Sequence, residues 1–185
     1  MLNLSEIKSG KNISLDGEPY VVLYHEHSKT GRAGSVLRTR IKNLRTGAVL
    51  EKTFQGSDKV EDADISKSVA QFLYREEDNL CFMDNSSYEQ FSINKDALGQ
   101  ATDYLLEGTE VSVLSFNGSP INIELPVKVT LEVTDAPPGV RGNTVSTGGK
   151  VATLETGLKI TVPLFVNVGD KVIVNTERGE YVSRA

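Results

Sequence analysis

The residues best suited to chemistry form a short basic loop, Lys29–Ser35, in which an arginine lies between two glycines. Arg32 stands at the expected tip, flanked by Gly31 and Gly34. A guanidinium group donates hydrogen bonds and carries charge, but it does not exchange a proton near neutral pH. Glycine tolerates positive φ angles and lets a partner approach the backbone closely. The loop therefore indicates binding of a phosphate-rich partner rather than acid–base catalysis, so we expect no catalytic residue and no cofactor.

Two expected strands position this loop. Residues 20–27 are rich in β-branched and aromatic side chains, which favour a strand. Residues 36–42 alternate with a period of two, which places Arg38, Arg40 and Lys42 on one face. These three cations are candidate contacts to the RNA backbone, and a merely solvated strand face is the alternative. The loop is thus expected at the end of a β-hairpin.

Charge is unevenly distributed along the chain. The net charge is −5, yet residues 1–52 contain nine Lys or Arg against five Asp or Glu. Residues 53–127 contain four against fourteen, and residues 128–185 contain seven against six. A protein that simply coats RNA is more often basic throughout. The asymmetry predicts that the first third contacts nucleic acid while the middle third faces solvent or a basic surface.

Short strands separated by turn signals predict an all-β fold of three consecutive small β-barrels. Turns recur about every ten residues between positions 13 and 54, which is typical of an SH3-like (KOW-like) barrel. An acidic stretch at 56–64 marks the first boundary. We therefore expect an N-terminal domain at 1–64 carrying the Arg32 loop, an acidic central OB domain at 65–127, and a C-terminal OB domain at 128–185.

One helix is expected among the strands of the central domain. Asn94 is a suitable N-cap, and apolar residues from Ala97 to Leu105 recur near helical spacing. Asn117–Gly118 then predicts a tight hairpin turn. Several short strands with one helix between them fit a five-stranded OB barrel.

The remaining reactive side chains predict neither a disulfide nor a metal site. Cys81 is the single cysteine, and its apolar neighbours predict a small buried side chain. His25 and His27 fall on one face of an expected strand, as two zinc ligands would, but no clear third ligand stands nearby in sequence. No apolar run is long enough to span a membrane, so we expect a cytoplasmic protein with no membrane partner.

A second candidate site is the Gly/Ser/Thr-rich loop before Val151. Its glycines and hydroxyls suit close approach to a sugar–phosphate backbone. It does not match a nucleotide-binding P-loop, because Thr144 stands where the first glycine is required and Val151 replaces the Ser or Thr. Tyr181 and Arg184 are further candidates, for stacking and for phosphate contact. The candidate loop residues are Gly142, Asn143, Thr144, Ser146, Thr147, Gly148, Gly149 and Lys150.

Short motifs along the whole chain carry a resemblance to a known family. They are Asp16–Tyr20, Thr46–Gly47, Glu51–Phe54, Phe82–Met83, Asn117–Gly118, Pro138–Gly142, Lys150–Ala152, Gly157, Ile160, Val162–Pro163, Val166, Gly169 and Gly179–Arg184. In order and spacing they resemble bacterial elongation factor P.

The resemblance implies a non-enzymatic translation factor with an SH3-like and two OB domains in an L-shaped, tRNA-like outline. Such a factor contacts both ribosomal subunits and ribosomal RNA between the peptidyl (P) and exit (E) tRNA sites. It relieves stalling at consecutive prolines by positioning the P-site peptidyl-tRNA, and the second loop would lie near the E-site mRNA codon. We expect it to act as a monomer. The implied tRNA-contact residues around Arg32 are Lys29, Thr30, Gly31, Ala33 and Gly34.

Arg32 departs from the pattern in which the tip is a modified lysine. Enzymes that extend lysine need a free amine, which arginine lacks, and Thr30 stands where many members have proline. Lys29–Arg32 and Lys42–Leu44 look like an arginine-bearing subgroup in which rhamnose is attached to the guanidinium. The resemblance therefore implies an arginine rhamnosyltransferase as a partner, with an unmodified arginine as the alternative.

Two other functions stay open at this point. One is a paralogue of elongation factor P with a shifted stalling preference. The other is a general single-stranded-RNA-binding OB protein, which should carry aromatic side chains along its groove strands. This chain has no Trp and an acidic centre. Tight binding to free RNA, without pelleting with ribosomes, would favour the second alternative.

Overall fold

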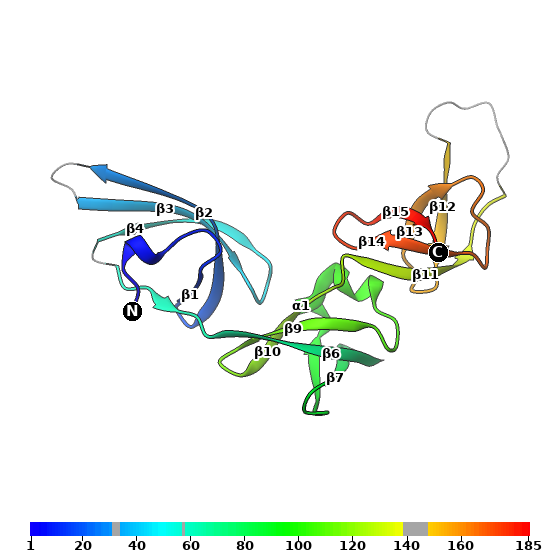
Figure 1. Cartoon of the computed structure of the whole chain (residues 1–185), viewed down its shortest axis with the longest axis horizontal. Helices are drawn as coiled ribbons and strands as arrows, with labels where there is room; N and C mark the ends of the chain where they lie inside the picture. Colours follow the sequence, from blue (N-terminus) through cyan, green and yellow to red (C-terminus); the bar gives the residue numbers. More distant parts are fainter. Residues whose placement is uncertain (31–33, 57, 139–147) are drawn as a thin grey trace. The chain divides into compact units, whose positions relative to one another are not determined.

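The computed structural model describes residues 1–30, 34–56, 58–138 and 148–185, and its regular structure is mainly β-strand (Figure 1). The strands form three five-stranded sheets that follow one another along the chain. Each sheet is antiparallel in the strand pairs whose register is defined. The expected all-β fold is confirmed, and the three consecutive small barrels that the sequence predicts correspond to these three sheets.

The first sheet has the strand order β4-β3-β2-β1-β5. Its strands are β1 Asn12–Leu15, β2 Glu18–Thr30, β3 Gly34–Asn43, β4 Val49–Gln55 and β5 Glu61–Asp62. Leu37 and Ile41 of β3 are fully buried, with Val22 of β2 and Phe54 of β4 packed in the same core. Because side chains alternate between the faces of a strand, Arg38, Arg40 and Lys42 are turned outward and are exposed.

The second sheet has the order β10-β9-β6-β7-β8. Its strands are β6 Ile65–Glu76, β7 Asn79–Asp84, β8 Gln90–Asn94, β9 Glu110–Phe116 and β10 Ser119–Glu124. Phe82 of β7 lies between Phe72 of β6 and Phe91 of β8, with ring centroids 5.5 and 5.7 Å apart. Such cross-strand aromatic pairs stabilise a sheet beyond simple burial.

The third sheet has the order β13-β12-β11-β14-β15. Its strands are β11 Lys128–Asp135, β12 Gly149–Leu154, β13 Lys159–Pro163, β14 Lys171–Asn175 and β15 Glu180–Arg184. Val129, Leu131 and Val133 of β11, with Val172 and Val174 of β14, alternate with outward residues and are buried in one apolar cluster. This alternation is the period-two pattern that the sequence predicts.

The expected helix is shorter than its apolar spacing indicates. The α-helix α1 covers only Lys95–Leu98, and the chain then continues as a 3-10 helix over Gly99–Tyr104. Gly99 has a φ of +53°, which lies outside the right-handed helical region and ends the α-helix there. The apolar spacing predicts the inward face correctly, since Leu98 and Leu105 are buried.

Tyr104, at the end of this 3-10 helix, packs into the core of the third sheet. Its hydroxyl lies 3.1 Å from the position that a Cβ on Gly179 would take, and Gly179 has a φ of +67°. The backbone angle favours glycine there, and a Cβ would crowd the Tyr104 hydroxyl. Burial, and secondarily the nearby Asp103 carboxylate, raise the pKa of Tyr104.

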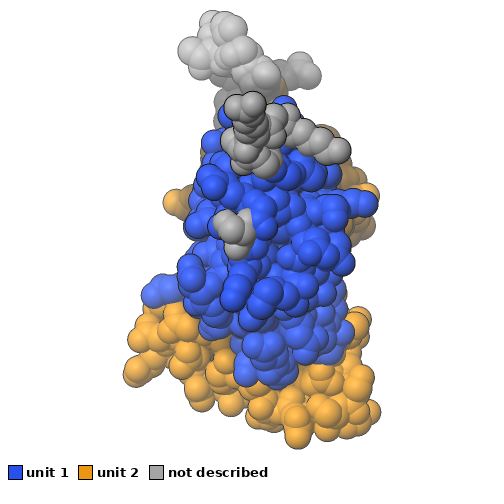
Figure 2. Space-filling view, turned by 90° about the vertical axis from the view of Figure 1, so that its left-hand side faces the viewer, with its two compact units in different colours: residues 1–68, 96–98, 113–123 blue, residues 69–95, 99–112, 124–185 orange. Residues whose placement is uncertain are grey.

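The chain forms two compact units, coloured separately in Figure 2. Unit 1 contains residues 1–68, 96–98 and 113–123, and unit 2 contains residues 69–95, 99–112 and 124–185. Unit 1 therefore combines the first sheet with most of the β9–β10 hairpin. Compactness alone does not decide the three-domain division at 1–64, 65–127 and 128–185, which stays a prediction.

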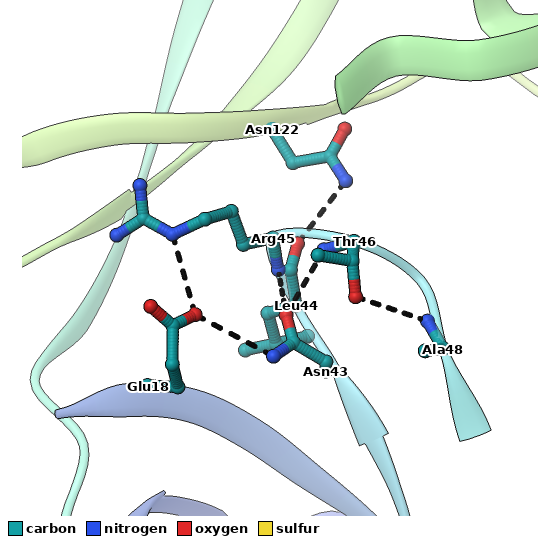
Figure 3. A network of polar contacts seen from close by, with 7 residues as sticks. All are labelled: Glu18, Asn43, Leu44, Arg45, Thr46, Ala48 and Asn122. Carbon is teal, nitrogen blue, oxygen red and sulfur yellow. Dashed lines mark hydrogen bonds and ion pairs between the residues drawn. The ribbon is translucent and has the colours of Figure 1, made fainter. Parts of the chain in front are cut away.

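Within unit 1, the turn after β3 contacts β10 (Figure 3). Asn43 stabilises this turn because its Oδ1 accepts hydrogen bonds from the backbone N–H groups of Arg45, at 2.8 Å, and Thr46, at 2.9 Å. The Nδ2 of Asn122 donates to the carbonyl oxygen of Leu44 at 3.1 Å. Arg45 also pairs with Glu18, with 3.4 Å between Nε and Oε2.

Leu44 adds an apolar anchor to the same joint. Its side chain packs against a cluster formed by Ala63, Leu114, Phe116 and Ile121. Its backbone N–H donates to the carbonyl oxygen of Pro19 at 2.9 Å, which ties it to the start of β2. The far end of β3 is thus fixed both to its own sheet and to the β9–β10 hairpin.

We expect Leu44→Ala to lower the free energy of unfolding of unit 1 by about 1–3 kcal/mol, because it removes a partly buried apolar contact. Leu50→Ala is the matched control, since Leu50 is 38% exposed on β4; its cost should stay under about 1 kcal/mol. Urea denaturation measures the free energy of unfolding of each variant, and amide hydrogen exchange in β9 and β10 shows whether the loss is felt in that hairpin. Equal costs for the two variants would contradict the anchoring role of Leu44.

Candidate nucleic-acid interface

The β2–β3 hairpin extends beyond the strands that flank it (Figure 1). Its register runs from Tyr20 opposite Asn43 to Thr30 opposite Gly34, with a bulge at Leu23. β1 pairs with β2 only up to Val21. We call residues 24–30 of β2, with their β3 partners 34–40, the arm. Along the arm, β2 has no strand neighbour other than β3 in the described sheet.

β4 supports the other side of the arm over part of its length. Its last residue, Gln55, pairs with Val36, so the final two rungs join only β2 and β3. These rungs are Lys29 with Ser35 and Thr30 with Gly34. The end of the hairpin is therefore a two-stranded ribbon that a partner could approach from both faces.

The outer face of the arm contains a shallow hollow of about 520 Å³. Arg38 pairs with Glu26 of β2 and with Thr53 of β4, and Arg40 pairs with Tyr24 and Glu51. Cross-strand neighbours point to the same side of a sheet. The residues that line the hollow are Tyr24, Glu26, Arg38, Thr39, Arg40, Glu51 and Thr53.

Arg38 and Arg40 form no ion pair with any residue that the structure describes, although Glu26 and Glu51 are their cross-strand neighbours. Both side chains are exposed, and so is Lys42 two residues further along β3. Three cations on one exposed strand face are suitable for contacts to successive phosphates. The sequence alternation therefore predicts their shared face correctly, while their RNA contacts stay a prediction.

Three residues of the predicted tip, Gly31, Arg32 and Ala33, lie outside the described residues. The backbones of Lys29, Thr30 and Gly34 are in the last two rungs of the hairpin, which is where a loop-bearing arm should hold them. Their assignment as tRNA contacts stays a prediction.

The second candidate loop is described only at its end. Gly142, Asn143, Thr144, Ser146 and Thr147 lie outside the described residues. The last three predicted residues are Gly148, Gly149 and Lys150.

Gly148 and Gly149 line a hollow of about 530 Å³ together with Tyr181. Lys150 is only 8% exposed, because it takes an inward-facing position of β12 beside the buried Ala152. Arg184 lies near Asp170, with 3.7 Å between Nη1 and Oδ2. Gly148, Gly149 and Tyr181 therefore come together at one surface.

Sequence reasoning missed the residues that share the outer face with the arginines. Tyr24 and Glu26 alternate on β2 with the same period as Arg38 and Arg40 on β3, and Glu51 and Thr53 do so on β4. The alternation of these side chains can be recognised in the sequence of each strand separately. Which residues of β2, β3 and β4 become neighbours depends on the register of the sheet, and that register includes the bulge at Leu23.

The two histidines do not form part of a metal site in the described structure, where no group of three His, Cys, Asp or Glu could hold an ion. Each contacts a serine instead. The Nδ1 of His25 accepts a hydrogen bond from the backbone N–H of Ser9 at 3.2 Å, and the Nε2 of His27 is hydrogen-bonded to the hydroxyl of Ser35.

The sequence matches family models along its length. Residues 3–60 match "Elongation factor P (EF-P) KOW-like domain", residues 65–123 match "Elongation factor P (EF-P) OB domain", and residues 129–184 match "Elongation factor P, C-terminal". The chain belongs to the elongation factor P family. It is accordingly a translation elongation factor rather than an enzyme, and this family implies the ribosome as a partner.

Individual relatives agree over the full chain. Elongation factor P of Dictyoglomus thermophilum is 47% identical over 185 residues, covering 100% of this chain and 100% of the relative. Elongation factor P of Thermotoga petrophila is 46% identical with the same coverage. A fold likeness extends to "Eukaryotic translation initiation factor 5A from Methanococcus jannaschii", with a TM-score of 0.56 and 22% identity over 67% of this chain and 91% of that chain. In the described ranges, none of the helices has the length and apolar character needed to cross a bilayer.

The unpaired state of Arg38 and Arg40 has a measurable consequence for stability. We expect Arg38→Gln and Arg40→Gln each to change the free energy of unfolding by less than about 0.5 kcal/mol, because neither guanidinium makes a described internal contact. Arg75→Gln is the matched control, since Arg75 Nη2 donates to the carbonyl oxygens of Thr102, at 2.6 Å, and Leu105, at 3.2 Å. Its loss should cost about 1–2 kcal/mol.

Chemical denaturation of the three variants makes this comparison. A destabilisation by Arg38→Gln or Arg40→Gln as large as that of Arg75→Gln would mean that the arm arginines serve the fold, and the interface would have to lie elsewhere.

Proposed function

We propose that the chain binds the ribosome between the P and E sites and speeds peptide-bond formation at consecutive prolines by positioning the P-site peptidyl-tRNA. The observation that carries this proposal is the arm, whose last two rungs extend beyond β4 and lead into the Arg32 loop. A two-stranded ribbon is narrow enough to enter a confined space. Membership of a family of translation elongation factors supports the ribosome as that space.

The mechanism that these residues support is positioning rather than proton transfer. Arginine remains protonated at physiological pH, so Arg32 can hold an RNA group in place but cannot act as a base. Correct orientation of reacting groups recovers on the order of several kcal/mol of activation free energy. Proline is a poor partner in peptide-bond formation because its ring restricts the reacting geometry. Holding the tRNA acceptor end would offset that restriction.

Phosphate contacts on the outer face would fix the register of the arm on RNA. Arg38, Arg40 and Lys42 point to one side and are exposed, and charge-assisted hydrogen bonds to phosphate are among the stronger polar contacts. Glu26 and Glu51 border the same hollow and would repel a phosphate placed anywhere except at the arginines. The hollow beside Gly148, Gly149 and Tyr181 is the corresponding candidate for contact with the E-site codon and ribosomal RNA.

A general single-stranded-RNA-binding function has less support. Such proteins stack successive bases on aromatic side chains along a basic groove. On the outer face, the aromatic side chain in the hollow is Tyr24, and the two arginines there alternate with two glutamates. Lys42 lies further along the same face, so the face is mixed in charge rather than uniformly basic. A mixed face favours one defined contact over sliding along RNA. A cytoplasmic, monomeric factor follows from the proposed role.

Arg32→Ala should reduce the rate of polyproline synthesis to that without the factor, because the tip can then neither donate hydrogen bonds nor carry charge. The measurement is the time course of a Pro-Pro-Pro-containing peptide in a reconstituted translation system. Arg178→Ala is the control, since Arg178 lies in the exposed turn between β14 and β15. Full stimulation by Arg32→Ala would show that the tip assignment is wrong.

We also propose that an arginine rhamnosyltransferase modifies Arg32 in the native host, because the guanidinium, unlike an amine, cannot accept the lysine-type extensions. The intact mass of native protein should exceed the mass of the sequence by one deoxyhexose residue, which is the free sugar less one water, and fragmentation should place the addition on Arg32. Protein with Arg32→Lys should show no addition. A native mass equal to that of the bare sequence would contradict the modification and leave arginine itself as the functional group.

A further inference from the structure

His25 and His27 lie on the inner face of the arm, opposite to the arginines. His25 is the cross-strand partner of Thr39 and His27 is that of Leu37, and both partners are buried on the core side of the sheet. His27 itself is exposed and His25 is half-buried, and neither belongs to the apolar core cluster of the first sheet. Neither histidine is therefore explained by core packing.

His25 makes its contact along the edge of β2 that has no strand neighbour in the arm. The loop before β1 reaches β2 through Gly10, whose N–H donates to the carbonyl oxygen of Val22 at 2.7 Å. Beyond Val22, the contact described on this side is that of His25 Nδ1 with Ser9, at 3.2 Å to the backbone nitrogen and 3.0 Å to Oγ. His25 thus extends the support of this edge into the arm.

His27 contacts the opposite strand of the arm near its end. Its Nε2 is hydrogen-bonded to the Oγ of Ser35. Ser35 pairs with Lys29 and His27 pairs with Leu37, so this bond is a diagonal link between rungs that are two apart in the ladder. Its Ser35 end lies one rung below Thr30 and Gly34, the last pair before the loop. The bond therefore opposes separation of the two strands where β4 no longer supports them.

We propose that His25 and His27 are positioning residues that set the direction and width of the arm, and hence the position of Arg32. This inference rests on the proposed function for its consequence on the ribosome, whereas the contacts themselves belong to the free protein. The two histidines use different ring nitrogens, Nδ1 in His25 and Nε2 in His27. That difference allows a crossed test.

The crossed test uses two conservative replacements at each position. The side-chain amide of Asn reaches about as far as Nδ1 of histidine, and that of Gln about as far as Nε2. We expect His25→Asn and His27→Gln to behave like the wild type. His25→Gln and His27→Asn should lose the contact, with amide exchange of the arm accelerated roughly two- to tenfold, as expected for one hydrogen bond.

The first measurement is hydrogen exchange of the arm amides in the full-length free protein. Ser35→Ala serves as a partner deletion, because it should abolish the difference between His27→Gln and His27→Asn while leaving that between the His25 variants unchanged. The second measurement is nitrogen NMR of the imidazoles at alkaline pH, where Nδ1 of His25 should carry no proton. A protonated Nδ1, or equal exchange in all four histidine variants, would overturn the proposal.

The polyproline synthesis assay then separates this inference from the proposed function. Positioning of Arg32 is supported if His25→Asn stimulates synthesis more than His25→Gln does, and if His27→Gln stimulates it more than His27→Asn does. If the wild type itself gives no stimulation while the exchange pattern is crossed, the proposed function fails and the arm contacts stand. If the wild type stimulates and all four variants do so equally, the positioning role is overturned and the proposed function stands.

Discussion

The structure depends on a mismatch in strand length within the first sheet. β2 and β3 continue after β1 has ended on one side and, two rungs from the loop, after β4 has ended on the other. An isolated two-stranded ribbon is marginally stable in water. This one is extended from a core in which Val22, Leu37 and Ile41 are almost completely buried. The core holds the hairpin as far as Leu37, which pairs with His27 within the arm, and the backbone ladder continues from there toward the loop.

β3 links this arm to a second fixed point. At one end it begins at Gly34, in the last rung, and at the other it ends at Asn43, whose side chain organises the following turn. Leu44 and Asn122 connect that turn to the β9–β10 hairpin within unit 1 (Figure 3). A strand resists bending along its length when its neighbours are paired. The position of the arm base is therefore determined jointly by the first sheet and by this joint.

Much of this could be predicted from sequence, because the controlling patterns are local. The alternation in residues 36–42 predicts the exposed face of Arg38, Arg40 and Lys42, and Asn117–Gly118 predicts the β9–β10 turn, where Asn117 has a φ of +50°. The prediction of one helix reaching Leu105 was wrong in its length, because the spacing of apolar residues carries no information on the positive φ of Gly99. The extent of the arm was not predictable, since it depends on where β1 and β4 end against their partners.

The distribution of charge on the arm bears on selectivity. A uniformly basic ribbon would bind any RNA, because phosphate attraction is independent of sequence. Here Arg38 and Arg40 are cross-strand neighbours of Glu26 and Glu51, so these two carboxylates weaken the positive field of the arginines at long range. At hydrogen-bonding distance the situation is different. Each guanidinium remains unpaired among the described residues and can still donate to a correctly placed phosphate. Together with the acidic excess of residues 53–127, this arrangement weakens non-specific RNA binding. It favours a partner whose shape presents its phosphates at the arginines.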